Sequence, residues 1–355
     1  MHRPHHGGNL AWAATVAGCP AYLIRDFSAS INPLGIPETV VTAIEEDIPR
    51  LVAYPNPDYP RLRHCLAKEL SVETDSILPG NGSAELLTWA ARDLAQQQVY
   101  LIVPAFGDYY RALQTFEAKI HPIVGQLPLG NLATLLAEVP HGSSLLLNNP
   151  HNPTGKLWRK EEILPLLERF ALVVIDEAFM DFLPPNEQQS LVIEAANSPN
   201  LVVLRSLTKF YSLPGLRIGY AVAHGDRISH WQRIRDPWSV NSLAATAAVV
   251  ALKDLDFQQY TWNWLVPARE ELAIGISNIE GFDPLPSAVN FLLVKSAISV
   301  TQLQEKLLQQ HRIYIRDCLS FPELGNGYFR VAVRTPAENR ALIEALSSVA
   351  KQIQQ

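Results

Sequence analysis

A lysine in a hydroxyl-rich stretch is the residue of this sequence best suited to covalent chemistry. Lys209 closely follows Ser206 and Thr208, and Arg217 comes eight residues later. An amine can bond to an aldehyde, while hydroxyls and a guanidinium can bind a phosphate group. The stretch therefore indicates a site for a cofactor that carries both an aldehyde and a phosphate. The alternative is that Lys209 is an ordinary lysine of a surface loop.

Two predicted strands flank this lysine. Residues 201–204 are apolar and include two β-branched valines, a pattern typical of a buried strand, and residues 216–222 read as another strand. Lys209 would then lie in the connection between them. In an open α/β sheet, ligands bind in the crevice beyond the ends of the strands. The position of Lys209 thus suits a binding site.

An acidic residue ends another predicted strand. Residues 172–175 are Leu-Val-Val-Ile, and Asp176 follows directly. A buried carboxylate needs a partner, because burying its charged form alone is costly. A protonated pyridine nitrogen would be such a partner, and a backbone N–H or a nearby arginine is the alternative.

Two further positions could contact a flat, phosphorylated cofactor. Gly82 and Ser83 open a predicted helix, where free backbone N–H groups favour an anion. The same Gly-Asn-Gly-Ser run could equally be an ordinary turn with a helix cap. Phe106 follows the strand predicted at residues 99–103 and could either stack on a ring or pack in the core.

Composition narrows the class of protein. With 355 residues, 48% of them hydrophobic, the chain can form one large and one smaller domain. A net charge of -6 without a basic cluster argues against nucleic-acid binding. No apolar run is long enough for a membrane span or a signal peptide, so we expect a cytoplasmic protein. Neither the three dispersed cysteines nor His2, His5 and His6 show the spacing of a metal site, so no metal is expected.

The order of predicted elements indicates an α/β protein. Strands and helices alternate up to about residue 240, which predicts a mainly parallel sheet covered by helices on both faces. We expect this large domain to span residues 41–244. Residues 245–355 read as a smaller α+β domain, against which residues 1–40 should pack. In this smaller domain we expect a helix over residues 300–310 and a single strand over residues 313–316.

Four motifs occur in a fixed order along the chain: Asn152-Pro153-Thr154-Gly155, Asp176-Glu177-Ala178, Ser206-Leu207-Thr208-Lys209 and Gly215-Leu216-Arg217. Together they resemble the pyridoxal-phosphate-dependent aminotransferase superfamily of fold type I, across essentially the whole chain. Within its histidinol-phosphate aminotransferase-like branch, the chain is most similar to the threonine-phosphate decarboxylases of cobalamin biosynthesis. The resemblance implies an aspartate aminotransferase-like fold with a sheet of the seven-stranded type.

The resemblance also implies roles for individual residues. Lys209 would bond to pyridoxal 5'-phosphate and move protons, Asp176 would keep the pyridine nitrogen protonated, and Asn152 would bond the ring's 3-oxygen. Tyr54 would reach the phosphate site of a neighbouring subunit, which implies a homodimer. The other expected cofactor contacts are Gly82, Ser83, Phe106, Ser206, Thr208 and Arg217. The expected substrate contacts are His6, Gly7, Asn32, Asn152, Arg316 and Arg330.

The implied activity is decarboxylation of a small phosphorylated amino acid, L-threonine O-3-phosphate, to 1-amino-2-propanol O-2-phosphate. We expect Arg330 to bind the carboxylate, and Arg316 to bind the phosphate together with residues of an N-terminal lid. An aminotransferase, such as one for histidinol phosphate, is the alternative. Phe179 favours the decarboxylase, because many aminotransferases have a tyrosine there that bonds the ring oxygen. A non-catalytic cofactor-binding regulator is a third possibility, expected least because no DNA-binding segment is evident.

Overall fold

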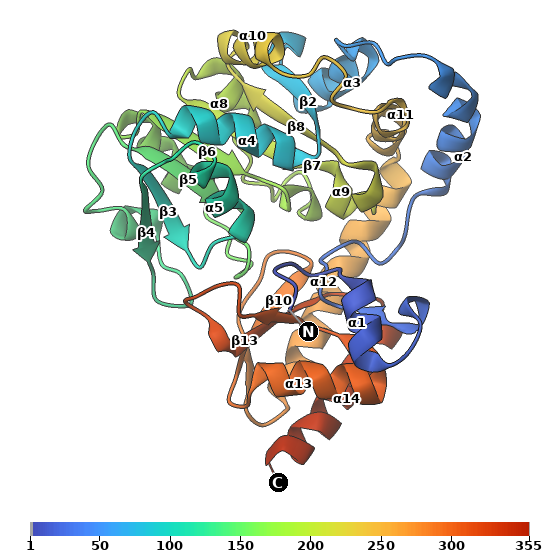
Figure 1. Cartoon of the computed structure of the whole chain (residues 1–355). Coiled ribbons are helices and arrows are strands. Elements are labelled where there is room, and N and C mark those ends of the chain that lie inside the picture. Colours follow the sequence, from blue (N-terminus) through green and yellow to red (C-terminus); the bar gives the residue numbers. More distant parts are fainter. Residues whose placement is uncertain (1–2, 355) are drawn as a thin grey trace.

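A seven-stranded sheet forms the larger part of the computed structural model, which describes residues 3–354 (Figure 1). The strand order is β2-β8-β7-β6-β5-β3-β4, and β8 runs antiparallel to its neighbours while the other pairs are parallel. The strands are β2 (Ile77–Asn81), β3 (Val99–Val103), β4 (Ile120–Val124), β5 (Ser144–Asn148), β6 (Leu172–Asp176), β7 (Leu201–Ser206) and β8 (Ile218–Ala223). The predicted fold class is confirmed.

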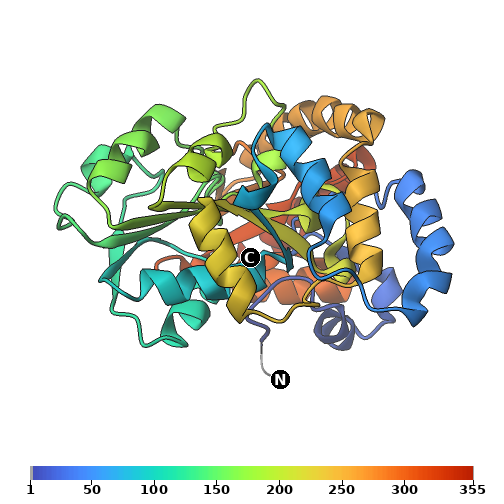
Figure 2. The same ribbon diagram turned by 90° about the horizontal axis from the view of Figure 1, so that it is seen from above.

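Both faces of this sheet are covered, which explains the continuous apolar runs of its central strands. In β6, Val173 and Ile175 enter one hydrophobic cluster, whereas Val174 enters the other. Helices lie on both faces in the view of Figure 2. One cluster includes α3 (Pro60–Leu70), α7 (Lys160–Ile163), α8 (Val192–Asn197) and α11 (Ser242–Ala251), and the other α4 (Ser83–Leu94), α5 (Gly107–Gln114) and α10 (Gly225–Ile234).

A smaller antiparallel sheet lies below the large one in Figure 1. Its order is β12-β13-β10-β9, with β9 (Phe282–Pro284), β10 (Phe291–Ser296), β12 (Arg316–Cys318) and β13 (Gly325–Ala332). The helices α12 (Leu255–Ser277), α13 (Val300–Lys306) and α14 (Pro336–Gln354) pack around it. No helix within residues 3–354 combines the length and apolar character needed to cross a membrane. The domain boundaries at residues 40 and 244 stay predictions.

The N-terminal segment packs on the C-terminal part of the chain. Strand β1 (Arg25–Asp26) pairs in parallel with β11 (Ile313–Tyr314). Helix α1 (Leu10–Ala17) contributes Trp12 and Ala13 to a cluster that also contains Tyr314. Helix α2 (Glu38–Asp47) then leads to the large sheet and packs on α11.

Two predictions about this part of the chain were wrong in detail. Residues 313–316 do not form a single strand, because β11 pairs with β1 while β12 pairs with β13, so Ile315 separates two strands with different partners. The helix predicted to residue 310 leaves the α-helical form after Lys306 and continues as a π-helical turn.

Candidate active site

The ends of the central strands and the small sheet enclose a cavity of about 220 Å³. It lies beyond the carboxyl ends of β5, β6 and β7, where α/β sheets commonly bind ligands. Most of the residues predicted for the site meet here. The predicted residues that line the cavity are His6, Gly7, Ser83, Phe106, Asn152, Asp176, Ser206, Thr208, Lys209, Arg217, Arg316 and Arg330.

One side of the cavity has the groups of a phosphate site. Gly82 has a positive φ of 73°, and a Cβ atom there would lie 2.5 Å from a terminal nitrogen of Arg217. The glycine therefore lets a guanidinium approach the N-terminus of α4, where backbone N–H groups favour an anion. The hydroxyls of Ser206 and Thr208 lie 2.7 Å apart in the same wall. Gly82 itself does not line the cavity, and its role here is to leave room for Arg217.

Lys209 reaches the cavity from the short helix α9 (Leu207–Phe210), which follows β7 directly. Burial and the positive charges of Arg217 and Arg330 lower the pKa of its amine to about 8. The negative charge of Asp176 acts in the opposite direction. A larger fraction of the amine is therefore neutral, and so nucleophilic, than for an exposed lysine.

Asp176 is a buried carboxylate that forms no salt bridge within residues 3–354. One carboxylate oxygen accepts from the backbone N–H of Ala178 at 3.0 Å, and the other from the hydroxyl of Tyr109 at 2.8 Å. The adjacent Glu177 differs, because Arg205 donates to it at 2.8 Å inside the protein. Asp176 is thus the acid left to face a cation in the cavity, such as a protonated ring nitrogen.

Two arginines of the small sheet face this cavity together. Arg316 of β12 and Arg330 of β13 are direct cross-strand partners. Arg330 lies with its guanidinium 4.9 Å from the centre of the Phe291 ring and donates to the side-chain oxygen of Asn152. Burial and the charge of Arg316 lower the pKa of Arg330 to about 10. Its Nε has no hydrogen-bond partner in the described chain, so it retains a free donor.

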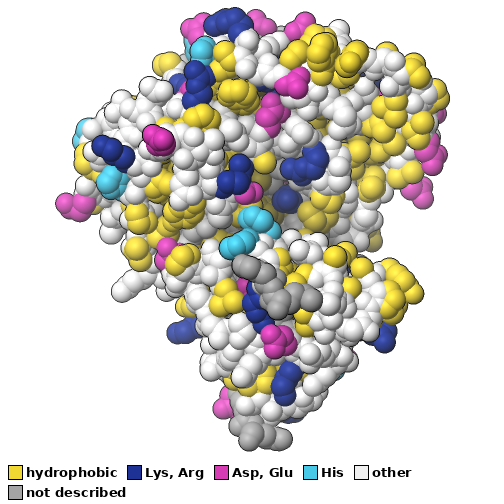
Figure 3. All heavy atoms as spheres, viewed as in Figure 1, with side chains coloured by type: hydrophobic (Ala, Val, Ile, Leu, Met, Phe, Trp, Pro, Cys, Tyr) yellow, Lys and Arg dark blue, Asp and Glu magenta, His cyan; other side chains and the backbone are white. Residues whose placement is uncertain are grey.

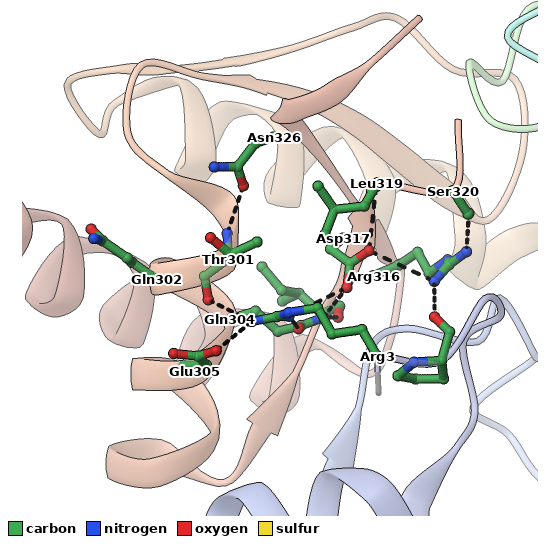
Figure 4. A network of polar contacts seen from close by, with 12 residues as sticks. Arg3, Thr301, Gln302, Gln304, Glu305, Arg316, Asp317, Leu319, Ser320 and Asn326 are labelled. Carbon is green, nitrogen blue, oxygen red and sulfur yellow. Dashed lines mark hydrogen bonds and ion pairs between the residues drawn. The ribbon is translucent and has the colours of Figure 1, made fainter. Parts of the chain in front are cut away.

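The N-terminal residues 3–8, here named the strap, lie over Arg316 (Figure 4). Arg316 donates to the backbone oxygens of Pro4 and His5 and to the hydroxyl of Ser320, and Asp317 lies 3.9 Å away. Its donors are therefore shared between the strap and the small sheet.

Both ends of the strap are fixed. At its start, Arg3 donates to the side chains of Gln304 and Glu305 on α13 and lies 3.6 Å from Asp317 (Figure 4). At its end, the N–H of Gly8 donates to the hydroxyl of Ser28 at 2.8 Å. A Cβ atom on Gly7 would lie 2.2 Å from the backbone oxygen of Ser28, so only glycine permits this approach.

Between these two anchors, the strap reaches the large sheet. The ring of His6 lies 5.5 Å from that of Phe106 and 3.8 Å from the carboxylate of Asp108. Burial lowers the pKa of His6, and the charge of Asp108 opposes this effect. The strap thus connects the small sheet to the residues that follow β3.

Besides Gly82, two predicted site residues do not line the cavity, Asn32 and Tyr54. Asn32 does not line the cavity; its amide donates to the backbone oxygen of Phe210 and the hydroxyl of Thr261, and its backbone N–H donates to the oxygen of Lys209. It therefore supports the segment that carries the lysine. Tyr54 is exposed and packs on Trp238, with ring centres 4.8 Å apart.

Among the cavity residues that were not predicted from the sequence, Ser30 and Tyr109 each bring a buried hydroxyl. The hydroxyl of Ser30 is buried, faces no hydrogen-bond partner in the described chain and lines the cavity two residues before Asn32. Tyr109 also lines the cavity, and its position three residues after Phe106, shortly after the strand predicted at residues 99–103, was the available signal. Within residues 3–354, no group of three or more His, Cys, Asp or Glu side chains could hold a metal ion.

Comparisons with known proteins agree with this geometry. Residues 24–346 match the family model described as aminotransferase class I and II. The threonine-phosphate decarboxylase of Salmonella typhimurium is 37% identical over 97% of this chain and 96% of its own, and a histidinol-phosphate aminotransferase of Roseiflexus castenholzii is 33% identical over 94% and 91%. The crystal structure of L-threonine-O-3-phosphate decarboxylase from Porphyromonas gingivalis has a TM-score of 0.82, with 26% identity over 92% of this chain and 99% of that one. The predicted resemblance is confirmed, and the chain belongs to the class I and II aminotransferase family.

Proposed function

We propose that this protein is a pyridoxal-phosphate-dependent decarboxylase of L-threonine O-3-phosphate. Its product would be 1-amino-2-propanol O-2-phosphate, used in cobalamin biosynthesis. The observation that carries this proposal is the cross-strand pair Arg316 and Arg330, which faces the same cavity as Lys209. A substrate with both a carboxylate and a phosphate needs two sets of donors in a buried site, because unpaired buried charge is costly.

The residues of the cavity fit the cofactor. Arg217, Ser206, Thr208 and the N-terminus of α4 offer donors for its phosphate. Asp176 forms no salt bridge with any described residue, so its carboxylate is available for the ring nitrogen. Further contacts of the ring are expected from Phe106 and Asn152, which line the same cavity. When bound, the cofactor takes up the electron pair left at the substrate's Cα as carbon dioxide leaves.

The protein's own groups supply orientation and protons. Arg330 binds the substrate carboxylate. It thereby orients the bond between Cα and the carboxylate so that the electrons of this bond can be withdrawn when it breaks. Arg316 binds the phosphate with the strap residues His6 and Gly7. Lys209, in its protonated ammonium form, then gives a proton to Cα, and a pKa of about 8 keeps much of the residue protonated at neutral pH. The strap excludes water and thereby strengthens the charge interactions in the site.

An aminotransferase is the second candidate, favoured by the 33% identity to a histidinol-phosphate aminotransferase. Both activities use the same cofactor groups, so these groups do not separate them. Phe179 lines the cavity and lacks a hydroxyl, which removes one donor to the ring oxygen. That loss is worth about 1 kcal/mol and favours the decarboxylase.

One assay separates the two activities. The purified protein should release carbon dioxide from L-threonine O-3-phosphate in equal amounts to the amine formed. With histidinol phosphate and 2-oxoglutarate, glutamate should not accumulate at a comparable rate. Glutamate formation without carbon dioxide release would assign the protein to the aminotransferases instead.

We further propose a homodimer. Near Tyr54 in the sequence, Ile48, Leu51 and Val52 are exposed, and Tyr54 itself packs on the exposed Trp238; these five residues are here named the Tyr54 patch. Figure 3 shows hydrophobic side chains gathered on the upper right of the molecule, on the side where Figure 1 places α2 and α11. Large exposed apolar patches commonly mark protein interfaces. A second copy that packs here would bring its Tyr54 toward the residues of the first copy that bind the cofactor phosphate. The cytoplasmic location stays a prediction.

A further inference from the structure

Tyr109 is a buried residue of the site that the proposed chemistry does not yet use. It lies in the first turn of α5 with 1% of its surface exposed, and it lines the cavity. Its hydroxyl donates to a carboxylate oxygen of Asp176 at 2.8 Å. Its ring meets the edge of Phe106, with centres 5.7 Å apart and planes at 85°.

The Tyr109 hydroxyl has one clear function in this arrangement. The second carboxylate oxygen of Asp176 accepts from Ala178, so the two donors fix both oxygens and thereby the plane of the carboxylate. Tyr109 stays protonated at working pH, because burial and the charge of Asp176 raise the pKa of its phenol well above the usual range. The phenol is therefore a permanent donor to Asp176.

We propose that Tyr109 is a positioning residue that orients Asp176 and stabilises its charged form, so that Asp176 can hold a protonated ring nitrogen. The inference rests on the proposed cofactor, but not on the choice between decarboxylase and aminotransferase. A hydrogen bond from a neutral donor to a buried carboxylate stabilises the charged form relative to the neutral acid.

The charged groups around Asp176 support this role. Burial raises the pKa of Asp176, and the hydrogen bond from Tyr109 is the first of the effects that oppose it. The amine of Lys209, on α9, acts in the same direction as Tyr109. Asp108, also on α5, raises the pKa of Tyr109 and so keeps the phenol a donor. Without the phenol, the proton that Asp176 and the ring nitrogen share would be found more often on Asp176 and less often on the ring nitrogen.

The test compares Tyr109→Phe with Tyr110→Phe in the cofactor-loaded protein. Tyr110 is the next residue of the same helix, is only partly buried, and has no contact with Asp176 among its described interactions. The measurement is the visible absorbance of the bound cofactor between pH 5 and 10. A less positively charged ring withdraws less electron density from the nitrogen that joins Lys209 to the cofactor. That nitrogen then holds its proton up to a higher pH. The midpoint of the absorbance change should therefore rise by about one pH unit in Tyr109→Phe, and stay unchanged in Tyr110→Phe.

Turnover and a double variant complete the test. The turnover number of Tyr109→Phe should fall by about 10-fold, with a smaller change in KM. In an Asp176→Asn background, Tyr109→Phe should change the absorbance midpoint by much less, because the charge it stabilises is gone. A wild-type midpoint in Tyr109→Phe, even with a lower melting temperature, would show a purely structural tyrosine and overturn the inference. Failure of the wild-type protein to bind the cofactor would instead refute the proposed function.

Discussion

At the scale of single residues, Lys209 has the most specific expected behaviour. Its amine must be neutral to bond to an aldehyde, and its pKa is lowered to about 8. The rate at which the cofactor-free protein takes up pyridoxal phosphate should therefore rise with pH and level off above about 8. Sodium borohydride should then fix the cofactor to Lys209, as read from a peptide map. A label on another lysine, or no label on the wild-type protein, would contradict the assignment.

Arg316 should determine the preference for phosphorylated substrates. Arg316→Ala removes a two-point donor from a buried anion site, so KM for L-threonine O-3-phosphate should rise by roughly 10- to 100-fold. The affinity for the cofactor should not change. The matched control is Arg340→Ala, which removes an exposed arginine of α14. Equal losses for threonine phosphate and plain threonine would indicate that Arg316 acts on the fold and not on the phosphate.

Most of the candidate site residues that were predicted from the sequence line the cavity, although their chemical roles stay predictions. An amine, a buried acid and an arginine at fixed spacings left few alternatives to Lys209, Asp176 and Arg217. Asn32 and Ser30 could not be separated in this way. They lie two residues apart in an irregular segment, where no periodicity sets the direction of a side chain. Only the structure shows that Ser30 faces the cavity while Asn32 supports the lysine segment.

At the scale of elements, the strap depends on its first anchor. Arg3 contacts two side chains of α13 and Asp317, while residues 5–7 lie over the cavity. Arg3→Ala should loosen the strap and raise KM for the phosphorylated substrate by about 3- to 10-fold, without changing the cofactor's absorbance. Arg25→Ala is the control, because Arg25 is an exposed arginine of the same N-terminal segment. A raised KM in both variants, or in neither, would show that the Arg3 anchor has no specific role.

The bounds of an element can be predicted when its own sequence carries a clear local pattern. They cannot be predicted when they depend on pairing with a distant segment of the chain. Helix α3 is an element of the first kind, because its apolar spacing and its initial proline are local signals in the sequence. Strand β4 was not predicted, because it is a half-exposed edge strand with a proline at its centre. The separation of β11 from β12 depends on β1, which lies more than 280 residues earlier.

At the scale of the whole molecule, the site lies between the two sheets. The large sheet supplies Asp176, helix α9 directly after its strand β7 supplies Lys209, and the small sheet supplies Arg316 and Arg330, while the strap connects the two sides. The groups proposed to bind the cofactor are thus on one sheet and the groups proposed to bind the substrate's anions on the other. Any relative movement of the sheets would change substrate affinity more than cofactor affinity.

The dimer is the remaining expectation at this scale. Val52 and Tyr54 of the Tyr54 patch have 95% and 81% of their surface exposed, which is unusual for apolar side chains so close in the sequence. Val52→Asp would place a charge in a desolvated interface, so the protein should become monomeric in light scattering and bind pyridoxal phosphate more weakly. The matched control is Val124→Asp at the edge strand β4, where a valine is 73% exposed on another part of the surface. A dimer that survives Val52→Asp, with unchanged cofactor affinity, would place the interface elsewhere and remove the proposed role of the partner's Tyr54.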